Sequence, residues 1–181
     1  MENIIPFVEG KLFLKVNSKK TEVAHISKVK YLGYSFYRCK GKCRFRVHTK
    51  SVTKMKNKIR ELTDRNKGIS NEEREKKYQE YVRGWVEYFR LADMKGLLIE
   101  IDKWARRRIR AVYWKQWKRV RTRYRILRKL KLEHWQAIKL ANSRCGYWRM
   151  AEMLGTVITN KIIVKLGYTS LLDHYLIVCE N

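Results

Sequence analysis

The stretch from Lys103 to Lys131 constrains the fold more than any other part of the chain. It contains 14 lysines and arginines and no aspartate or glutamate. Apolar residues nevertheless recur through it at steps of three or four, and with Gln116 they form one series: Ile101, Ala105, Ile109, Val112, Gln116 and Val120. This spacing predicts a helix with one buried stripe. The cations then crowd the other faces, where they repel one another unless a polyanion neutralises them.

Aromatic side chains stand among these cations, at Trp104, Tyr113, Trp114, Trp117 and Tyr124. Guanidinium groups suit phosphate oxygens, and aromatic rings stack on unpaired bases. The sequence therefore predicts an RNA-binding surface made of Arg106, Arg107, Arg108, Arg110, Lys115, Lys118, Arg119, Arg121 and Arg123. The alternative is a solvated helix whose tryptophans belong to the core.

Composition supports a folded chain with a polyanionic partner. The 181 residues are 45% hydrophobic, and 43 lysines and arginines against 17 acids give a net charge of +26. Nucleic acid is the favoured partner and an anionic membrane surface the other candidate. No run of 18 apolar residues occurs, and MENIIPFVEG lacks the pattern of a signal peptide. We therefore expect a cytoplasmic location, no membrane partner and reduced cysteines.

The first 48 residues favour β structure. Strands are predicted at 12–16, 29–37 and 43–48, and the CKGKC segment with Gly41 at its centre predicts a tight hairpin. Three strands cannot close a sheet, and an open edge needs a partner. We interpret this region as the end of a larger sheet.

Helical periodicity begins after Ser51. A first apolar stripe runs from Val52 to Leu62, and its helix is expected to stop near 66–68. Ser70 and Glu73 form a capping box, and the helix that follows places Tyr78, Val82, Trp85 and Phe89 on one face, which favours a core role for Trp85 and Phe89.

The third helix carries the basic stretch. Asp93 is its predicted N-cap, and a break is expected at 121–124. A further helix is predicted at 132–143, an interruption at 146–150, where Tyr147 and Trp148 could pack or stack, and one or two short helices at 156–176. The predicted fold is mainly α: a three-helix bundle plus C-terminal helices, with a short N-terminal antiparallel β element.

Several segments resemble one protein family in the same order. They are KVKYLGYSFY, KSVTKMKNKIRELTDRNKGIS, YVRGWVEYFRLAD, IDKWARRRIRAVYWKQWKR, LANSRCGYWRMAEM and LGYTSLLDHYL. They resemble the C-terminal part of group II intron reverse transcriptase/maturases, over about residues 10–176. The resemblance implies that 1–48 are the last palm strands, 49–125 the thumb or maturase domain X, and 126–181 the adjacent basic segment, which contacts DNA in some members.

The chain departs from that family where the family has its polymerase chemistry. No YADD motif precedes the matched strands, and the first aspartate is Asp64, already in the thumb-like region. We therefore expect no catalytic residues, no cofactor and no polymerase activity from this chain alone. The opening Met1 suggests a truncated or split reading frame.

Binding of structured group II intron RNA, to assist its folding and splicing, is the expected function. Two alternatives stay open. One is the thumb of a split RNA-directed DNA polymerase, completed by a separate polypeptide that carries the fingers and palm. The other is a general nucleic-acid-binding module, or a relic, without a splicing role; DNA remains a further partner in either case.

Metal and hydrolytic sites are weakly indicated. Cys39, Cys43 and His48 have a tolerable spacing for zinc ligands, but no fourth ligand lies nearby. Two thiols on facing strands of a hairpin is the favoured interpretation, so no metal site is predicted. The four histidines are scattered, and no P-loop or GxGxxG motif occurs.

Overall fold

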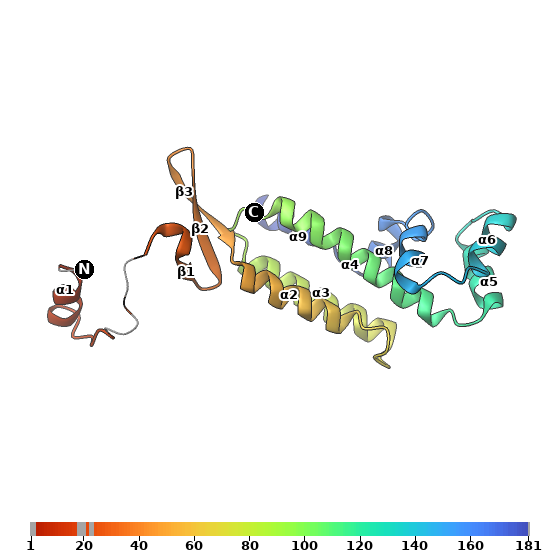
Figure 1. Cartoon of the computed structure of the whole chain (residues 1–181), viewed down its shortest axis with the longest axis horizontal. Helices are drawn as coiled ribbons and strands as arrows, with labels where there is room; N and C mark the ends of the chain where they lie inside the picture. Colours follow the sequence, from red (N-terminus) through yellow and green to blue (C-terminus); the bar gives the residue numbers. More distant parts are fainter. Residues whose placement is uncertain (1–2, 18–20, 22–23, 181) are drawn as a thin grey trace.

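The computed structural model describes residues 3–17, 21 and 24–180. Figure 1 shows an elongated molecule in which a small β-sheet lies at one end of a bundle of long helices. The helices α5 (Val120–Lys129) and α6 (His134–Ala141) form the other end, and α1 (Ile4–Gly10) lies beyond the sheet. The prediction of a mainly helical fold with a short N-terminal antiparallel sheet is confirmed.

The sheet has three antiparallel strands in the order β1-β2-β3, with β1 at Lys30–Tyr31, β2 at Tyr34–Cys39 and β3 at Lys42–Val47. Lys40 and Gly41 join β2 to β3, and both have positive φ, at 47° and 77°. Two positive-φ residues give a hairpin turn whose twist matches that of the strands. The predicted hairpin around Gly41 is therefore confirmed.

Two predictions for this region are wrong. No strand forms at 12–16, and the predicted strand at 29–37 is divided by a turn at Leu32 and Gly33. The structure instead has α1 and the short 3-10 helix η1 (Ile26–Lys28) before the sheet. A short apolar run becomes a strand only when a neighbouring strand pairs with it. Phe13, which is 88% exposed, has no sheet to cover it.

Gly33 connects the sheet to the helices. Its carbonyl oxygen accepts hydrogen bonds from the His48 backbone N–H at 2.9 Å and from the Ser51 hydroxyl at 3.1 Å. Its φ is +84°, and a Cβ at this position would lie 2.9 Å from Ser51 Oγ and 3.1 Å from the Phe89 ring. Only glycine combines this backbone conformation with so close a contact.

Three long helices, α2 (Thr49–Leu62), α3 (Asn71–Tyr88) and α4 (Lys95–Gln116), lie side by side in the bundle. The Ser70 hydroxyl accepts a hydrogen bond from the Glu73 N–H at 3.1 Å, so the predicted cap of α3 is confirmed. The predicted apolar faces are buried, including both Trp85 and Phe89, except for Val52, which is half-buried. The stripe of α4 is buried from Ile101 to Val112 and ends there, since Gln116 and Val120 are exposed.

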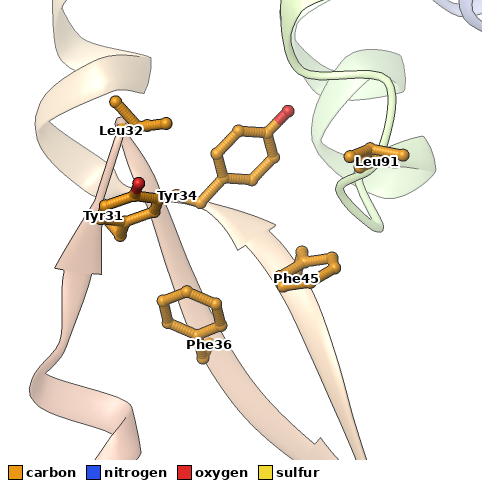
Figure 2. Close-up of a pocket in the computed structure, with 6 residues that line it drawn as sticks. All are labelled: Tyr31, Leu32, Tyr34, Phe36, Phe45 and Leu91. Carbon is orange, nitrogen blue, oxygen red and sulfur yellow. The ribbon is translucent and has the colours of Figure 1, made fainter. Parts of the chain in front are cut away.

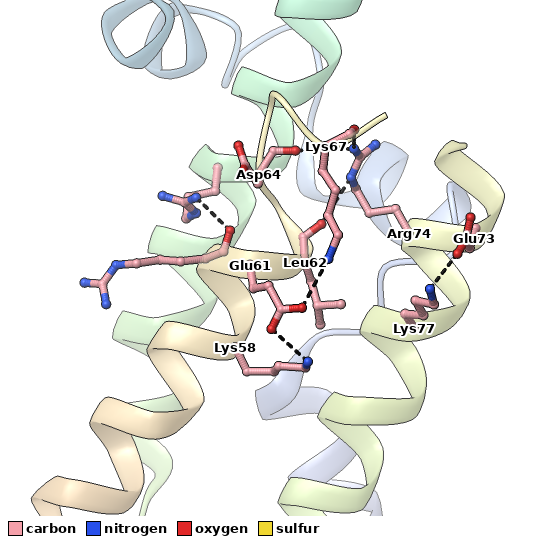
Figure 3. Close-up of polar contacts among 10 residues, drawn as sticks. Lys58, Glu61, Leu62, Asp64, Lys67, Glu73, Arg74 and Lys77 are labelled. Atoms are coloured by element: carbon pink, nitrogen blue, oxygen red, sulfur yellow. Dashed lines mark hydrogen bonds and ion pairs between the residues drawn. The ribbon is translucent and has the colours of Figure 1, made fainter. Parts of the chain in front are cut away.

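A buried arginine fixes the loop between α2 and α3. Arg74 is only 1% exposed, and its guanidinium donates to the carbonyls of Leu62 at 3.1 Å and Lys67 at 3.3 Å, and to Asn71 Oδ1 at 3.0 Å. Figure 3 shows the Arg74 side chain pointing into this loop. A buried charge requires such acceptors. Because the loop folds around Arg74, α2 ends at Leu62, earlier than predicted.

Asp93 does not cap α4, and that prediction is wrong. The N-cap is Met94, without a side-chain hydrogen bond. The Asp93 carboxylate instead accepts from the Tyr37 hydroxyl at 2.7 Å and from Arg44 at 3.3 Å. The hydrogen bond from Tyr37 and the nearby Arg44 charge lower the pKa of Asp93. The residue therefore ties the hairpin to the start of α4.

The C-terminal part is a series of short helices that pack along the bundle. The break after α4 comes at 117–119, a few residues before the predicted position. The helices α7 (Tyr147–Met153), α8 (Asn160–Lys165) and α9 (Leu171–Glu180) follow α6. The predicted interruption at 146–150 is wrong, because residues 147–150 lie in α7. Of the predicted range only Gly146, the N-cap of α7, is not helical. No helix in the described ranges is both long and apolar enough to cross a bilayer.

Candidate nucleic-acid interface

The predicted RNA-binding residues fall into two groups according to their contacts. Arg110 belongs to the first group, being 9% exposed; it donates to the Ile158 carbonyl at 2.8 Å and to Asn160 Oδ1 at 3.0 Å. Arg106 lies 3.6 Å from the buried Asp102 carboxylate. Arg110 therefore holds residues 158–160 against α4, whereas Arg106 pairs with a carboxylate of its own helix. That they also bind RNA stays a prediction.

Arg123 has a similar structural role at the start of α5. It donates to the Trp117 carbonyl at 2.8 Å, and its guanidinium carbon lies 4.3 Å from the ring centroid of Trp114. Trp114 and Trp117 are buried, as the alternative interpretation of the basic stretch expected for its tryptophans. These two rings cannot stack on bases without unfolding.

The position of Arg107 and Arg108 off the apolar stripe predicts that both side chains point into solvent. In the structure both are partly buried. Arg107 Nε donates to the Trp148 carbonyl at 3.1 Å, and its Nη2 lies 2.7 Å from Glu152. Arg108 Nε donates to the Thr63 hydroxyl at 2.7 Å. Both arginines therefore join α4 to neighbouring elements while keeping part of each guanidinium at the surface.

These arginines belong to a surface where guanidinium groups alternate with rings. Arg60 and Arg108 each lie 5.4 Å from the ring centroid of Trp104, Arg107 lies 4.2 Å from that of Trp148, and Arg65 lies 4.7 Å from that of Tyr147. We call this set the cation–aromatic face: Arg60, Arg65, Trp104, Arg107, Arg108, Tyr147 and Trp148. Stacked guanidinium groups and rings of this kind suit unpaired bases and phosphates.

The cation–aromatic face is crowded with positive charge. The pKa of Arg108 is lowered, first by partial burial and then by repulsion from Arg60 and Arg65. Arg108 remains charged at neutral pH, since an arginine begins from a pKa above 12. An anionic or electron-rich ligand placed here would relieve this repulsion.

The second group of cations is mostly exposed, although Arg128 donates to the Leu132 carbonyl at 2.8 Å. Lys118, Arg119 and Arg121 are exposed at the break between α4 and α5. Beyond them, a shallow depression on α5 is lined by Arg121, Tyr124, Arg125, Arg128 and Lys129. We call its cations the α5 basic face: Arg121, Arg125, Arg128 and Lys129. Lys115 is half-buried and donates to Asn66 Oδ1.

Sequence reasoning missed Arg60, Arg65, Arg125, Arg128 and Lys129. For α5 a signal was present, since positions 121, 125 and 128 recur at helical spacing and so share one face. For Arg60 and Arg65 none was available, because their proximity to α4 and α7 depends on the tertiary fold.

The residues considered as zinc ligands do not converge. Cys39 pairs with Lys42 across the hairpin, and Cys43 pairs with Arg38. His48 lies at the other end of β3 and caps α2 by accepting from the Lys50 N–H at 3.1 Å. In the ranges that the structure describes, no group of three or more His, Cys, Asp or Glu side chains could hold a metal ion.

The fold and surface define a strongly basic helical protein with an arginine-rich, aromatic face. Residues 52–132 match the family model of the group II intron, maturase-specific domain. The matched segment begins in α2 and ends just after α5, so it contains the whole basic stretch. The resemblance to the C-terminal part of a maturase is thereby confirmed. No curated protein matches the chain.

Proposed function

We propose that the chain binds structured group II intron RNA and assists its folding for splicing. In this proposal the RNA, with its own Mg²⁺, performs the chemistry, and the protein supplies positive charge and stacking surfaces but no catalytic group. The chain would act in the cytoplasm, and residues 126–181 would offer DNA a further contact. The predicted division into 1–48, 49–125 and 126–181 stays a prediction, and its second boundary falls within α5.

One observation carries the proposal more than the others. The ion pairs among the described residues leave the whole α5 basic face without a carboxylate partner. A helix with several unpaired cations on one face repels itself, unless phosphates supply the counter-charge. Because this helix lies inside the matched maturase-specific segment, intron RNA is the polyanion we favour.

The test is splicing of a group II intron RNA at a Mg²⁺ concentration too low for efficient self-splicing. We expect the purified protein to raise the splicing rate. A variant with Arg121→Gln and Arg125→Gln is expected to lose most of this effect, whereas Lys103→Gln, on an exposed residue outside both faces, should keep it. Equal splicing with and without protein, although the RNA is bound, would contradict the role in splicing.

The sheet favours a second candidate, the thumb of a split polymerase. Figure 2 shows apolar side chains of the sheet and of Leu91 around a shallow hollow of about 260 Å³. Tyr31, Leu32 and Leu91 are each more than 60% exposed. An apolar face of this kind fits a protein partner. A separate palm-bearing polypeptide should then bind the chain and give primer extension, and a Leu91→Glu variant should prevent both.

A further inference from the structure

A small hollow lies within the cation–aromatic face, where the end of α2 meets α4 and α7. Its lining consists of Thr63, Asp64, Arg65, Arg108, Ala111 and Trp148. Its volume is about 130 Å³. That is well above the ~10–15 Å³ that a cavity needs to hold one water, but well below the ~300 Å³ at which sites for larger organic ligands begin. The hollow therefore suits one small planar group.

Trp148 provides a surface on which such a group can stack. The side chain is 44% exposed, and Arg107 covers part of it, with the guanidinium carbon 4.2 Å from the ring centroid. Trp148 lines the hollow, whereas Arg107 does not. The Arg107 contact and its hydrogen bond to the Trp148 carbonyl hold the ring in place. A fixed ring amid cations is a stacking platform for a nucleobase.

Two guanidinium groups supply hydrogen-bond donors at the rim. Arg108 is fixed by its bonds to the Thr63 hydroxyl at 2.7 Å and to the Arg60 carbonyl at 3.2 Å. Arg65 stacks on the ring of Tyr147, and no hydrogen bond or ion pair holds its guanidinium in the part of the chain that the structure describes. Its donors are therefore available to a ligand.

Asp64 supplies the acceptor. One of its carboxylate oxygens accepts from the Asn66 N–H at 2.9 Å, and no cation among the described residues lies within ion-pair distance of this carboxylate. A phosphate would be repelled by this carboxylate, so the arginines alone do not decide the ligand. The ligand must present donors toward Asp64 and acceptors toward the arginines.

Guanine is the base whose edges meet both requirements. It has O6 and N7 as neighbouring acceptors, which pair with an arginine fork, and N1–H and N2–H₂ as neighbouring donors, which pair with a carboxylate. We propose that this hollow binds one unpaired guanine of the RNA, stacked on Trp148 and read by Asp64 and the two arginines. The inference rests on the proposed RNA binding and adds the class of nucleotide that the surface selects.

The test uses the full chain and RNA hairpins that differ only in one bulged base. Hairpins with a bulged guanine, a bulged adenine or no bulge are compared in equilibrium binding. We expect roughly tenfold tighter binding of the guanine bulge than of the other two, the size of one good base-specific contact. A 6-thioguanine placed in the bulge should crosslink to the tryptic fragment 145–149, which contains Trp148.

Variants separate stacking from a structural role. Trp148→Leu and Asp64→Asn should each abolish the preference for guanine, and Trp148→Phe should retain it. In Trp148→Leu and Asp64→Asn, the affinity for the unbulged hairpin should change less than the affinity for the guanine bulge. Equal affinity for all hairpins, with RNA binding intact, would overturn the guanine site but not the proposed function. If Trp148→Leu weakens binding of bulged and unbulged hairpins by the same factor, the preference for guanine is retained, and this result would also overturn the guanine site. If no hairpin binds, both fail.

Discussion

Asp102 on α4 holds the first turn of α9 in place, since its carboxylate accepts a hydrogen bond from the Ser170 hydroxyl at 2.8 Å. The same carboxylate accepts from the backbone N–H groups of Leu171 at 3.0 Å and Leu172 at 3.1 Å. Asp102 thus caps a helix 68 residues later in the chain. The last acid before the basic stretch is therefore a structural residue.

Asp102→Asn should destabilise the protein. The substitution replaces hydrogen bonds to a charged acceptor by weaker ones in a buried setting, at an expected cost of about 1–3 kcal/mol. Chemical denaturation measures this free energy of unfolding. Glu100→Gln is the matched control on the same helix: it removes only an exposed pair with Lys103 and should cost at most about 0.5 kcal/mol. Equal effects of the two variants would contradict the capping role.

Gly33→Ala should destabilise the junction between the sheet and the bundle. Alanine would adopt a strained positive φ there and bring its Cβ to 2.9 Å from Ser51 Oγ, so we expect a loss of about 1–3 kcal/mol. Gly84 in α3 has nothing within 4 Å of the corresponding position. Gly84→Ala should accordingly raise the stability by roughly 0.5–1 kcal/mol. Thermal unfolding of both variants checks the opposite signs.

Charge removal should separate binding from folding. Arg121→Gln combined with Arg125→Gln removes two exposed cations, so the melting temperature should stay the same while the salt slope of RNA binding falls by about 2 units. Arg110→Gln should lower the melting temperature and leave the salt slope unchanged, because its buried guanidinium holds residues 158–160. If the double variant melts at a lower temperature and Arg110→Gln does not, the structural and the exposed cations are assigned the wrong way round.

Hydrogen exchange should distinguish the sheet from the bundle. The strands bury Ser35 and Val47, whereas α2 and α3 bury several large apolar side chains each. Amides in 30–47 should exchange well before those of α2 and α3, because few buried contacts oppose local opening. Equal protection in both regions would mean that another chain covers the sheet.

The helical part of the fold was predictable because its apolar spacing is regular and its start signals are local. The stripe from Ile101 to Val112 and the Ser70 cap are examples of such local signals. The strand expected at 12–16 failed because pairing depends on a neighbour that the local sequence does not specify. The helix at Tyr147–Met153 was missed because its seven-residue pattern is too short to read, and packing against α4 decides it.

The candidate interface was less predictable than the fold. Helical spacing distinguishes buried from exposed positions, but it cannot show that Arg110 lies under residues 158–160 or that Arg107 packs on Trp148. For the same reason Arg60 and Arg65 were absent from the predicted set, although Arg60 lies beside the Trp104 ring and Arg65 beside the Tyr147 ring. Long-range packing therefore decides which cations of a basic helix remain available to RNA.

The salt dependence of RNA binding tests the central claim most directly. Equilibrium filter binding of the full chain to a folded group II intron RNA is measured from 50 to 200 mM salt. If six to ten phosphates are neutralised, the affinity should fall by about 10³- to 10⁵-fold for a duplex-like surface. A flat response, or equally weak binding at both salt concentrations, would contradict the account of this basic chain as an RNA-binding maturase-type domain.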